Sequence, residues 1–134
     1  MFTGLSKFRF YRGLKDIKLA IRQEVIENIP KAHRTPDALY LKEHSAMPIR
    51  LTAAIYLTDA NDFETKERYV DEIMFELMLL CDEVEEQEQA RVISQSTAAS
   101  IYVKIRAVLD EINKFKNYLK HKRVSDGSRV SEGA

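Results

Sequence analysis

The sequence predicts an all-α protein, an up-down-up-down four-helix bundle. Apolar residues return every three or four positions through most of the chain, which places them on one face of a helix. The 134 residues also include only four glycines and three prolines, fewer than turn-rich β folds need. Apolar residues make up 45% of the chain, enough for one core. We therefore expect one bundle at residues 12–123, between a leader at 1–11 and a disordered tail at 124–134.

The leader is basic and aromatic. Phe2, Phe8, Phe10 and Tyr11 alternate there with lysine and arginine. Rings stack on bases and cations meet phosphates, so this composition suits nucleic acid. Docking of the same rings onto the bundle is the interpretation we favour. Residues 1–12 hold no continuous apolar run of the secretory kind, and no run in the chain is long enough for a bilayer. We expect a cytoplasmic protein.

The first helix is expected at residues 12–28, where an apolar stripe has basic residues on its other side. The stripe consists of Leu14, Ile17, Ile21 and Val25, and the basic side of Lys15, Lys18 and Arg22. Pro30 ends this helix, because the residue before a proline disfavours the helical conformation.

The second helix is expected at residues 37–58. Thr35 and Pro36 form a suitable N-cap and first position for it. Its predicted apolar side consists of Leu39, Tyr40, Ala46, Ile49, Ala53, Tyr56 and Leu57. Pro48 lies in the middle and removes a backbone donor, so we expect one kinked helix.

The third helix is expected at residues 63–88. Its seam is Tyr69, Ile73, Leu77, Leu80 and Val84, with Val70, Met74, Met78 and Cys81 beside it. Its outer face is acidic. Acids near its end oppose the helix dipole, which predicts weakly helical last turns and a connection between residues 84 and 91.

The fourth helix is expected at residues 89–123 and has the clearest pattern in the chain. Its narrow seam consists of Ile101, Ile105, Val108, Ile112, Phe115 and Leu119. A basic flank runs beside this seam. The remaining residues, 124–134, are serine, glycine and charge without periodicity, which predicts the disordered tail.

Charge is divided unevenly although the net formal charge is zero. Residues 1–58 carry +5, residues 59–88 carry −10 and residues 89–134 carry +5. Such asymmetry is typical of a dipolar surface that joins a basic face for polyanions to an acidic face for another partner. The alternative is solvated helix faces with charge pairing between helices.

Motifs for catalysis are missing from the sequence. It has no glycine-rich phosphate loop, no Cys-x-x-Cys and no His-Glu-x-x-His. The single Cys81 is expected to be a buried thiol. We predict a non-enzymatic protein without cofactor or metal; a carboxylate metal enzyme is the weakest of three hypotheses.

Two short motifs carry a resemblance. Ile29-Pro30-Lys31-Ala32-His33, followed by Tyr40-Leu41-Lys42, resembles the junction of helices one and two in accessory variability determinant (Avd) proteins. These are small four-helix proteins of diversity-generating retroelements, similar in layout to proteins encoded in 23S ribosomal RNA intervening sequences. The resemblance covers residues 14–123. This chain departs from the family in its neutral charge and acidic third helix.

The resemblance implies a non-enzymatic partner of a reverse transcriptase that assists mutagenic copying of a template RNA. It also implies a ring-shaped homo-oligomer, a pentamer, that binds RNA or DNA through a basic surface. It implies no membrane association.

The leading hypothesis assigns phosphate contacts to basic residues of both outer segments. The candidates are Arg12, Lys15, Lys18, Arg22, Lys31, His33, Arg34, Lys42, Lys114, Lys116, Lys120, Lys122 and Arg123. For His33 the alternative is a hydrogen bond that shapes the turn. We predict that the basic residues of helices one and four form one composite surface. The second hypothesis is a protein-interaction bundle whose acidic third helix docks a partner, without a nucleic-acid role.

Overall fold

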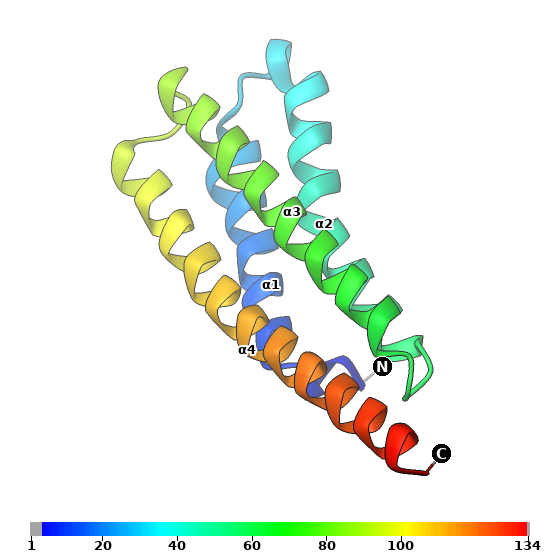
Figure 1. Ribbon diagram of the computed structural model, residues 1–134. Coiled ribbons are helices and arrows are strands. Elements are labelled where there is room, and N and C mark those ends of the chain that lie inside the picture. Colours follow the sequence, from blue (N-terminus) through cyan, green and yellow to red (C-terminus); the bar gives the residue numbers. More distant parts are fainter. Residues whose placement is uncertain (1–3, 134) are drawn as a thin grey trace.

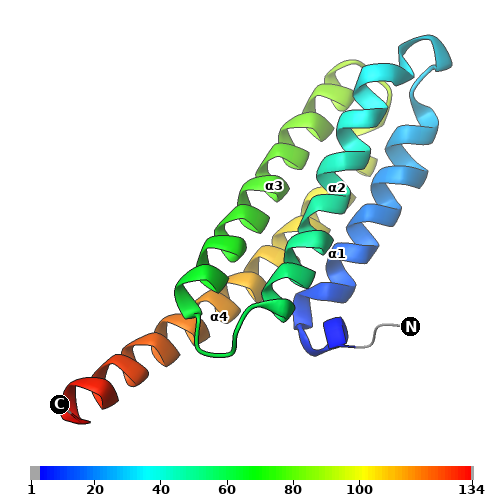
Figure 2. The same cartoon turned by 90° about the vertical axis from the view of Figure 1, so that its right-hand side faces the viewer.

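The computed structural model describes residues 4–133, with the side chains of residues 33–35 and 126–133 outside the description. Over residues 4–133 the chain consists of helices joined by short turns and contains no strand (Figure 1). Four long helices, α1 (Arg9–Ala20), α2 (Arg34–Leu57), α3 (Phe63–Gln89) and α4 (Gln95–Gly133), each run opposite to the one before (Figures 1 and 2). The predicted four-helix packing is confirmed, whereas the ring-shaped oligomer stays a prediction.

Short helical segments complete the chain between the long helices. A 3-10 turn, η1 (Gly4–Lys7), precedes α1. After α1 the chain continues as a π-helix, η2 (Ile21–Val25), and a 3-10 turn, η3 (Ile26–Asn28). A further 3-10 turn, η4 (Lys31–His33), leads into α2. The first helical stretch therefore ends at the predicted residue 28 but starts three residues before the predicted residue 12.

The core lies where the four helices meet. Its largest fully buried side chains are Phe10, Leu14, Ile17, Ile21, Ile29, Leu41, Ile55, Ile73, Leu77, Leu80, Ile101 and Ile105. The stripes predicted for the first and fourth helices are confirmed, with Phe115 partly buried. On α3 the predicted neighbour Met78 is wrong: it lies 65% exposed, whereas Val70 is fully buried.

The predicted apolar side of α2 is also wrong. Leu39 and Leu57 are 56% and 76% exposed, whereas Ser45 and Thr52 are buried. The apolar residues of α2 lie on all sides of the helix, so their spacing in the sequence did not indicate which face is buried. The two hydroxyls are tolerated in the core because each donates to a carbonyl of its own helix: Ser45 to Lys42 at 3.1 Å and Thr52 to Pro48 at 2.8 Å.

Two further predictions concern α2: that Thr35 is its N-cap and that the helix continues through Pro48. The helix already includes Thr35, so Thr35 is not its N-cap. Pro48 lies inside the continuous helix and does not split it. The lost backbone donor of Pro48 thus interrupts one hydrogen bond without ending the helix.

The connection between α3 and α4 lies later than predicted, and the last turns of α3 are helical in spite of their acids. The amide of Val92 donates to the carbonyl of Gln87 at 2.9 Å, and that of Arg91 to Glu88 at 3.0 Å. This is a Schellman motif, which satisfies the last carbonyls of the helix. Arg91 takes the left-handed conformation that the motif requires, with φ 62°.

The fourth helix begins at Gln95 instead of the predicted residue 89. The Ser94 side chain accepts from the amide of Thr97 at 3.1 Å and so caps the new helix. At the other end α4 continues past the predicted residue 123 to Gly133 and extends beyond the bundle (Figure 2). Residues 121–125 are exposed there, and a helix can continue past its packed part because each added residue closes one more hydrogen bond. The side chains of residues 126–133 lie outside the description, and the expected disorder of the tail stays a prediction.

Two rings of the leader, those of Phe8 and Phe10, pack against Phe115 of α4, as we expected. Phe10 is 2% exposed, and the centroids of Phe8 and Phe10 lie 5.4 and 5.6 Å from that of Phe115. Phe2 lies outside the described residues. Next to this cluster α1 and α4 approach closely at Gly13, where a Cβ atom would lie 2.4 Å from Cγ2 of Val108. Glycine is therefore required for this helix separation.

Candidate nucleic-acid interface

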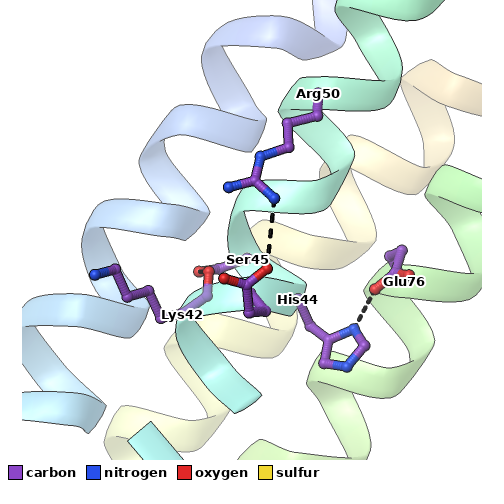
Figure 3. Close-up of polar contacts among 6 residues, drawn as sticks. Lys42, His44, Ser45, Arg50 and Glu76 are labelled. Carbon is purple, nitrogen blue, oxygen red and sulfur yellow. Dashed lines mark hydrogen bonds and ion pairs between the residues drawn. The ribbon is translucent and has the colours of Figure 1, made fainter. Parts of the chain in front are cut away.

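A groove of about 1060 Å³ lies between the first helical stretch and α2. Five of the predicted phosphate contacts line it: Lys15, Lys18, Arg22, Lys31 and Lys42. The first three share a helix face because they are three and four positions apart. Lys31 comes from η4 and Lys42 from α2, on the opposite side of the groove. Figure 3 shows Lys42 extending from α2 toward the α1 ribbon.

The lining of this groove is amphipathic. Its apolar part includes Leu19 and Leu39, which are 43% and 56% exposed, together with Ile26, Ala38 and Ile49. Asp16 is the only acidic residue among its described lining residues. The groove also includes Tyr11, and the Nζ atom of Lys15 lies 5.5 Å from the centroid of that ring. Cations beside apolar and aromatic surface are the features with which proteins hold single-stranded nucleic acid.

The opposite edge of α2 carries a different polar contact. The Nδ1 atom of His44 meets a carboxylate oxygen of Glu76 on α3 (Figure 3). The ring of Tyr40 lies 4.1 Å from the His44 ring, centroid to centroid. Further toward the end of α3, the carboxylate of Glu83 is only 9% exposed. Burial raises the pKa of Glu83 to about 7, and the nearby carboxylates of Glu86 and Asp37 add to this increase. A hydrogen bond from Gln87 has the opposite effect and lowers the pKa.

These α2–α3 contacts were missed by the sequence analysis. The amide of Gln87 donates to Glu83 at 3.1 Å and to Asp37 at 3.2 Å, and so links α3 to the start of α2. Desolvation and then the charge of Glu83 raise the pKa of the Tyr40 phenol. His44 and Glu76 are 32 positions apart, so no local spacing could have paired them.

Three of the predicted contacts on α4 are engaged in ion pairs instead. Lys116 lies 2.5 Å from Asp71 and Arg123 lies 2.9 Å from Glu67, both on α3, and Lys114 lies 3.2 Å from Glu111. Arg123 and Glu67 are close enough for an ion pair, but they do not form a hydrogen bond, because the Glu67 oxygen that faces Arg123 has no hydrogen-bond partner. Such pairing reduces the charge that these residues offer to a ligand.

The remaining described candidates, Arg12, Lys120 and Lys122, lie outside the groove. Arg12 is exposed on α1. The side chains of His33 and Arg34 lie outside the described residues. On α4, Lys120 is exposed and Lys122 lies over the ring of Tyr118. Among the described residues, none of α4 lines the groove, so the predicted composite surface is not a single hollow.

The acidic outer face of α3 has apolar residues within it. Phe75 and Met78 are 59% and 65% exposed, close in sequence to Asp71, Glu72 and Asp82. Large exposed apolar side chains within a polar rim are typical of protein contact surfaces.

Other kinds of site find little support in the part of the chain described. Within it, no three His, Cys, Asp or Glu side chains gather so that they could hold a metal ion. No described helix combines the length and apolar character needed to cross a bilayer. Cys81 is half-buried, and burial raises the pKa of its thiol.

Fold and groove together define an all-helical bundle with a basic, amphipathic groove between its first two helices. No protein-family model, curated protein or solved structure matches the chain. The resemblance to Avd proteins therefore depends on the short motifs of the sequence alone.

Proposed function

We propose that the protein is a non-catalytic RNA-binding accessory protein whose α1–α2 groove holds a single strand through its phosphates. The observation that carries this proposal is the convergence of five cations on one groove with a single acid. Each lysine or arginine there serves as a phosphate contact, and the apolar lining with Tyr11 accepts bases.

We further propose that this RNA is the template of a diversity-generating retroelement and that the protein works beside its reverse transcriptase. The two motifs that resemble Avd proteins support this proposal, because Lys31 and Lys42 belong to them and both line the groove. The resemblance and the groove thus concern the same segment of the chain.

A salt titration with fluorescent oligouridylate tests the groove. Five phosphate contacts on a single strand give a slope of log K against log salt of about −3.5. The double substitution Lys18→Gln and Lys42→Gln should reduce that slope by about 1.4. The matched control, Lys104→Gln with Arg106→Gln on α4, removes the same charge outside the groove and should leave the slope unchanged. Absence of binding at low salt, or equal slopes for both variants, contradicts the proposal.

The retroelement part has separate tests. A reverse transcriptase gene and an adenine-rich template repeat should lie beside the gene of this protein, and the two purified proteins should associate. The mass of the pure protein in solution should be that of a homo-oligomer, with a pentamer expected. A monomer, or a gene without a neighbouring reverse transcriptase, counts against this part alone.

A second candidate function follows from the α3 face. Phe75 and Met78, exposed among acids, are suited to a partner with a basic, apolar surface. In this case the substitutions Glu72→Lys and Phe75→Ser should abolish association with the partner and, at about 150 mM salt, leave RNA binding unchanged. If RNA binding is lost as well, the two surfaces are not separate.

A further inference from the structure

A second hollow, of about 480 Å³, lies at the opposite end of α2 from η4. It is formed by η1, the turn between α2 and α3, and the second half of α4, which meet at one end of the bundle (Figures 1 and 2). These segments are far apart in the sequence, and of their residues only the basic, aromatic leader and Lys122 of α4 were candidates for contact with nucleic acid.

Three lysines line this hollow, and each lies over an aromatic ring of the same lining. The Nζ atom of Lys7 is 6.0 Å from the ring centroid of Tyr56, and that of Lys66 is 5.7 Å from Phe63. The Nζ atom of Lys122 is 5.7 Å from the centroid of Tyr118. The lysines come from η1, α3 and α4, and Tyr56 comes from α2, so the fold brings together three similar pairs from four elements.

The charge of the hollow has one sign. Its described lining contains no aspartate or glutamate, and Asn61 is the uncharged amide beside the lysines. Lys66 also donates to the carbonyl of Ala60 at 3.3 Å, which holds its ammonium at the rim. Three ammonium groups without a carboxylate in the lining attract an anion, and a phosphate can accept from all of them.

The ring of Tyr118 is the accessible one for stacking among the described tyrosines of the hollow, because Gly4 and Lys7 lie against the ring of Tyr56. Tyr118 is 54% exposed and Tyr56 is 37% exposed. Phe8 and Phe115 lie in edge contact with each other, 5.4 Å between centroids, and support this wall. A lysine over an exposed ring is held weakly, so it can turn to a phosphate while a base takes its place on the ring. The volume also lies in the range of roughly 300–1,000 Å³ typical of small-molecule sites.

We propose that this hollow binds one nucleotide, with its base on the ring of Tyr118 and its phosphate among Lys7, Lys66 and Lys122. The nucleotide is either free in solution or part of an RNA strand. In the second case the hollow is a contact additional to the α1–α2 groove and rests on the proposed function.

Titration of the full-length protein with three probes tests the chemistry: adenosine monophosphate, adenosine and inorganic phosphate, followed by calorimetry. The monophosphate should saturate a single site and bind at least fivefold more tightly than either fragment, since base and phosphate both contribute. Tyr118→Ala should weaken it at least fivefold. Tyr118→Phe, which keeps the ring, should stay within twofold of the wild type, and Lys122→Gln should reduce the advantage of the monophosphate over adenosine.

Equal affinity for the monophosphate and inorganic phosphate overturns the proposal, as does an unchanged affinity in Tyr118→Ala. Because Tyr118 is 54% exposed, its truncation leaves the core intact, and circular dichroism of each variant checks this. The variant Lys18→Gln with Lys42→Gln, altered only in the α1–α2 groove, should keep its affinity for the monophosphate within twofold.

Photocrosslinking of an oligonucleotide that contains 5-iodouridine distinguishes the two sources. A crosslink to the Tyr118 peptide assigns the hollow to the RNA strand; monophosphate binding without that crosslink assigns it to a free nucleotide. If the monophosphate fails to bind while oligouridylate keeps its salt slope, the hollow is rejected and the proposed function stands. If the slope is lost while the monophosphate still binds, the proposed function fails and the hollow stands.

Discussion

Replacement of Glu83 by glutamine should make the protein more stable at alkaline pH. Glu83 is 9% exposed on α3, and its pKa is raised from 4.5 to about 7, chiefly by burial. Since the folded state holds the proton more tightly than the unfolded state, the stabilisation is complete below about pH 4.5. It is lost as the pH rises through about 7.

The size of this effect on stability follows from the shift in the pKa of Glu83. A change from 4.5 to about 7 corresponds to a loss of about 3 kcal/mol of unfolding free energy between the two pH limits. Glu83→Gln keeps the shape of the side chain and an oxygen that can accept from Gln87, but it carries no charge at any pH. The variant should therefore exceed the wild type by up to about 3 kcal/mol at pH 8 and approach it near pH 4.5.

Urea denaturation at pH steps between 4.5 and 8.5 measures the difference. The control Glu72→Gln removes an exposed carboxylate from the same helix and should follow the wild-type pH profile. Parallel profiles for Glu83→Gln and the wild type would refute the argument, because burial of the carboxylate would then have no energetic cost.

Two further predictions concern helix ends and helix contact, and urea denaturation checks both. Arg91→Gly should stabilise the protein by about 0.5–1 kcal/mol, because φ 62° costs an arginine more than a glycine; a loss of stability would show that the Arg91 side chain matters more than its conformation. Gly13→Ala should destabilise by about 1–3 kcal/mol, since its Cβ would lie 2.4 Å from Val108. In a Val108→Ala background this cost should fall by at least about 1 kcal/mol, and an equal cost in both backgrounds would contradict the steric argument.

Sequence periodicity predicted the helices best where apolar residues occupy one face only. On α4 the spacing of Ile101, Ile105 and Ile112 identified the buried side without ambiguity. On α2 it failed, because Leu39 and Leu57 are apolar but exposed while Ser45 is polar but buried. A serine or threonine can be buried when its hydroxyl bonds to a carbonyl of its own helix, and the sequence pattern does not indicate this.

Helix ends depended on local chemistry that the sequence shows only in part. Asp62 accepts from the amide of Thr65 at 3.1 Å, in the polar turn where the sequence places the start of α3. The end of α3 was predicted to within one residue, but the start of α4 was placed six residues too early, because the turn that follows α3 has Arg91 in a conformation usually taken by glycine. An arginine at this position does not indicate a Schellman motif, because glycine is the residue usually found there.

The candidate site was predictable on one side of the molecule only. Lys15, Lys18 and Arg22 follow a helical spacing, so their common face could be read from the sequence. The pair of Lys116 and Asp71 joins residues 45 positions apart, and such a contact follows from tertiary packing alone. The sequence therefore indicated the basic residues that line the groove but could not indicate the ion pairs of α4.

The same packing explains how a neutral chain can offer a basic groove. The acidic α3 lies between α2 and α4, and it neutralises cations of α4 at Asp71 and Glu67. Contacts join α1 to α2 and α4, which leaves α1 across the bundle from α3. With helix diameters of roughly 10 Å, the outer acids of α3 lie about 20 Å from the groove. That distance exceeds the Debye length of about 8 Å at physiological ionic strength, so the outer acids of α3 do not neutralise the basic groove although the net charge is zero.

This argument predicts a salt-dependent effect of the α3 acids. At about 10 mM salt the Debye length reaches about 30 Å, and the double substitution Glu72→Gln and Asp82→Asn should strengthen oligouridylate binding about two- to fivefold. At about 150 mM salt the same substitutions should leave the affinity unchanged, since the repulsion is screened. Fluorescence anisotropy at both salt concentrations measures this difference. An equal gain at both concentrations would mean that the acids touch the bound strand, and the RNA would then lie across α3 instead of in the α1–α2 groove.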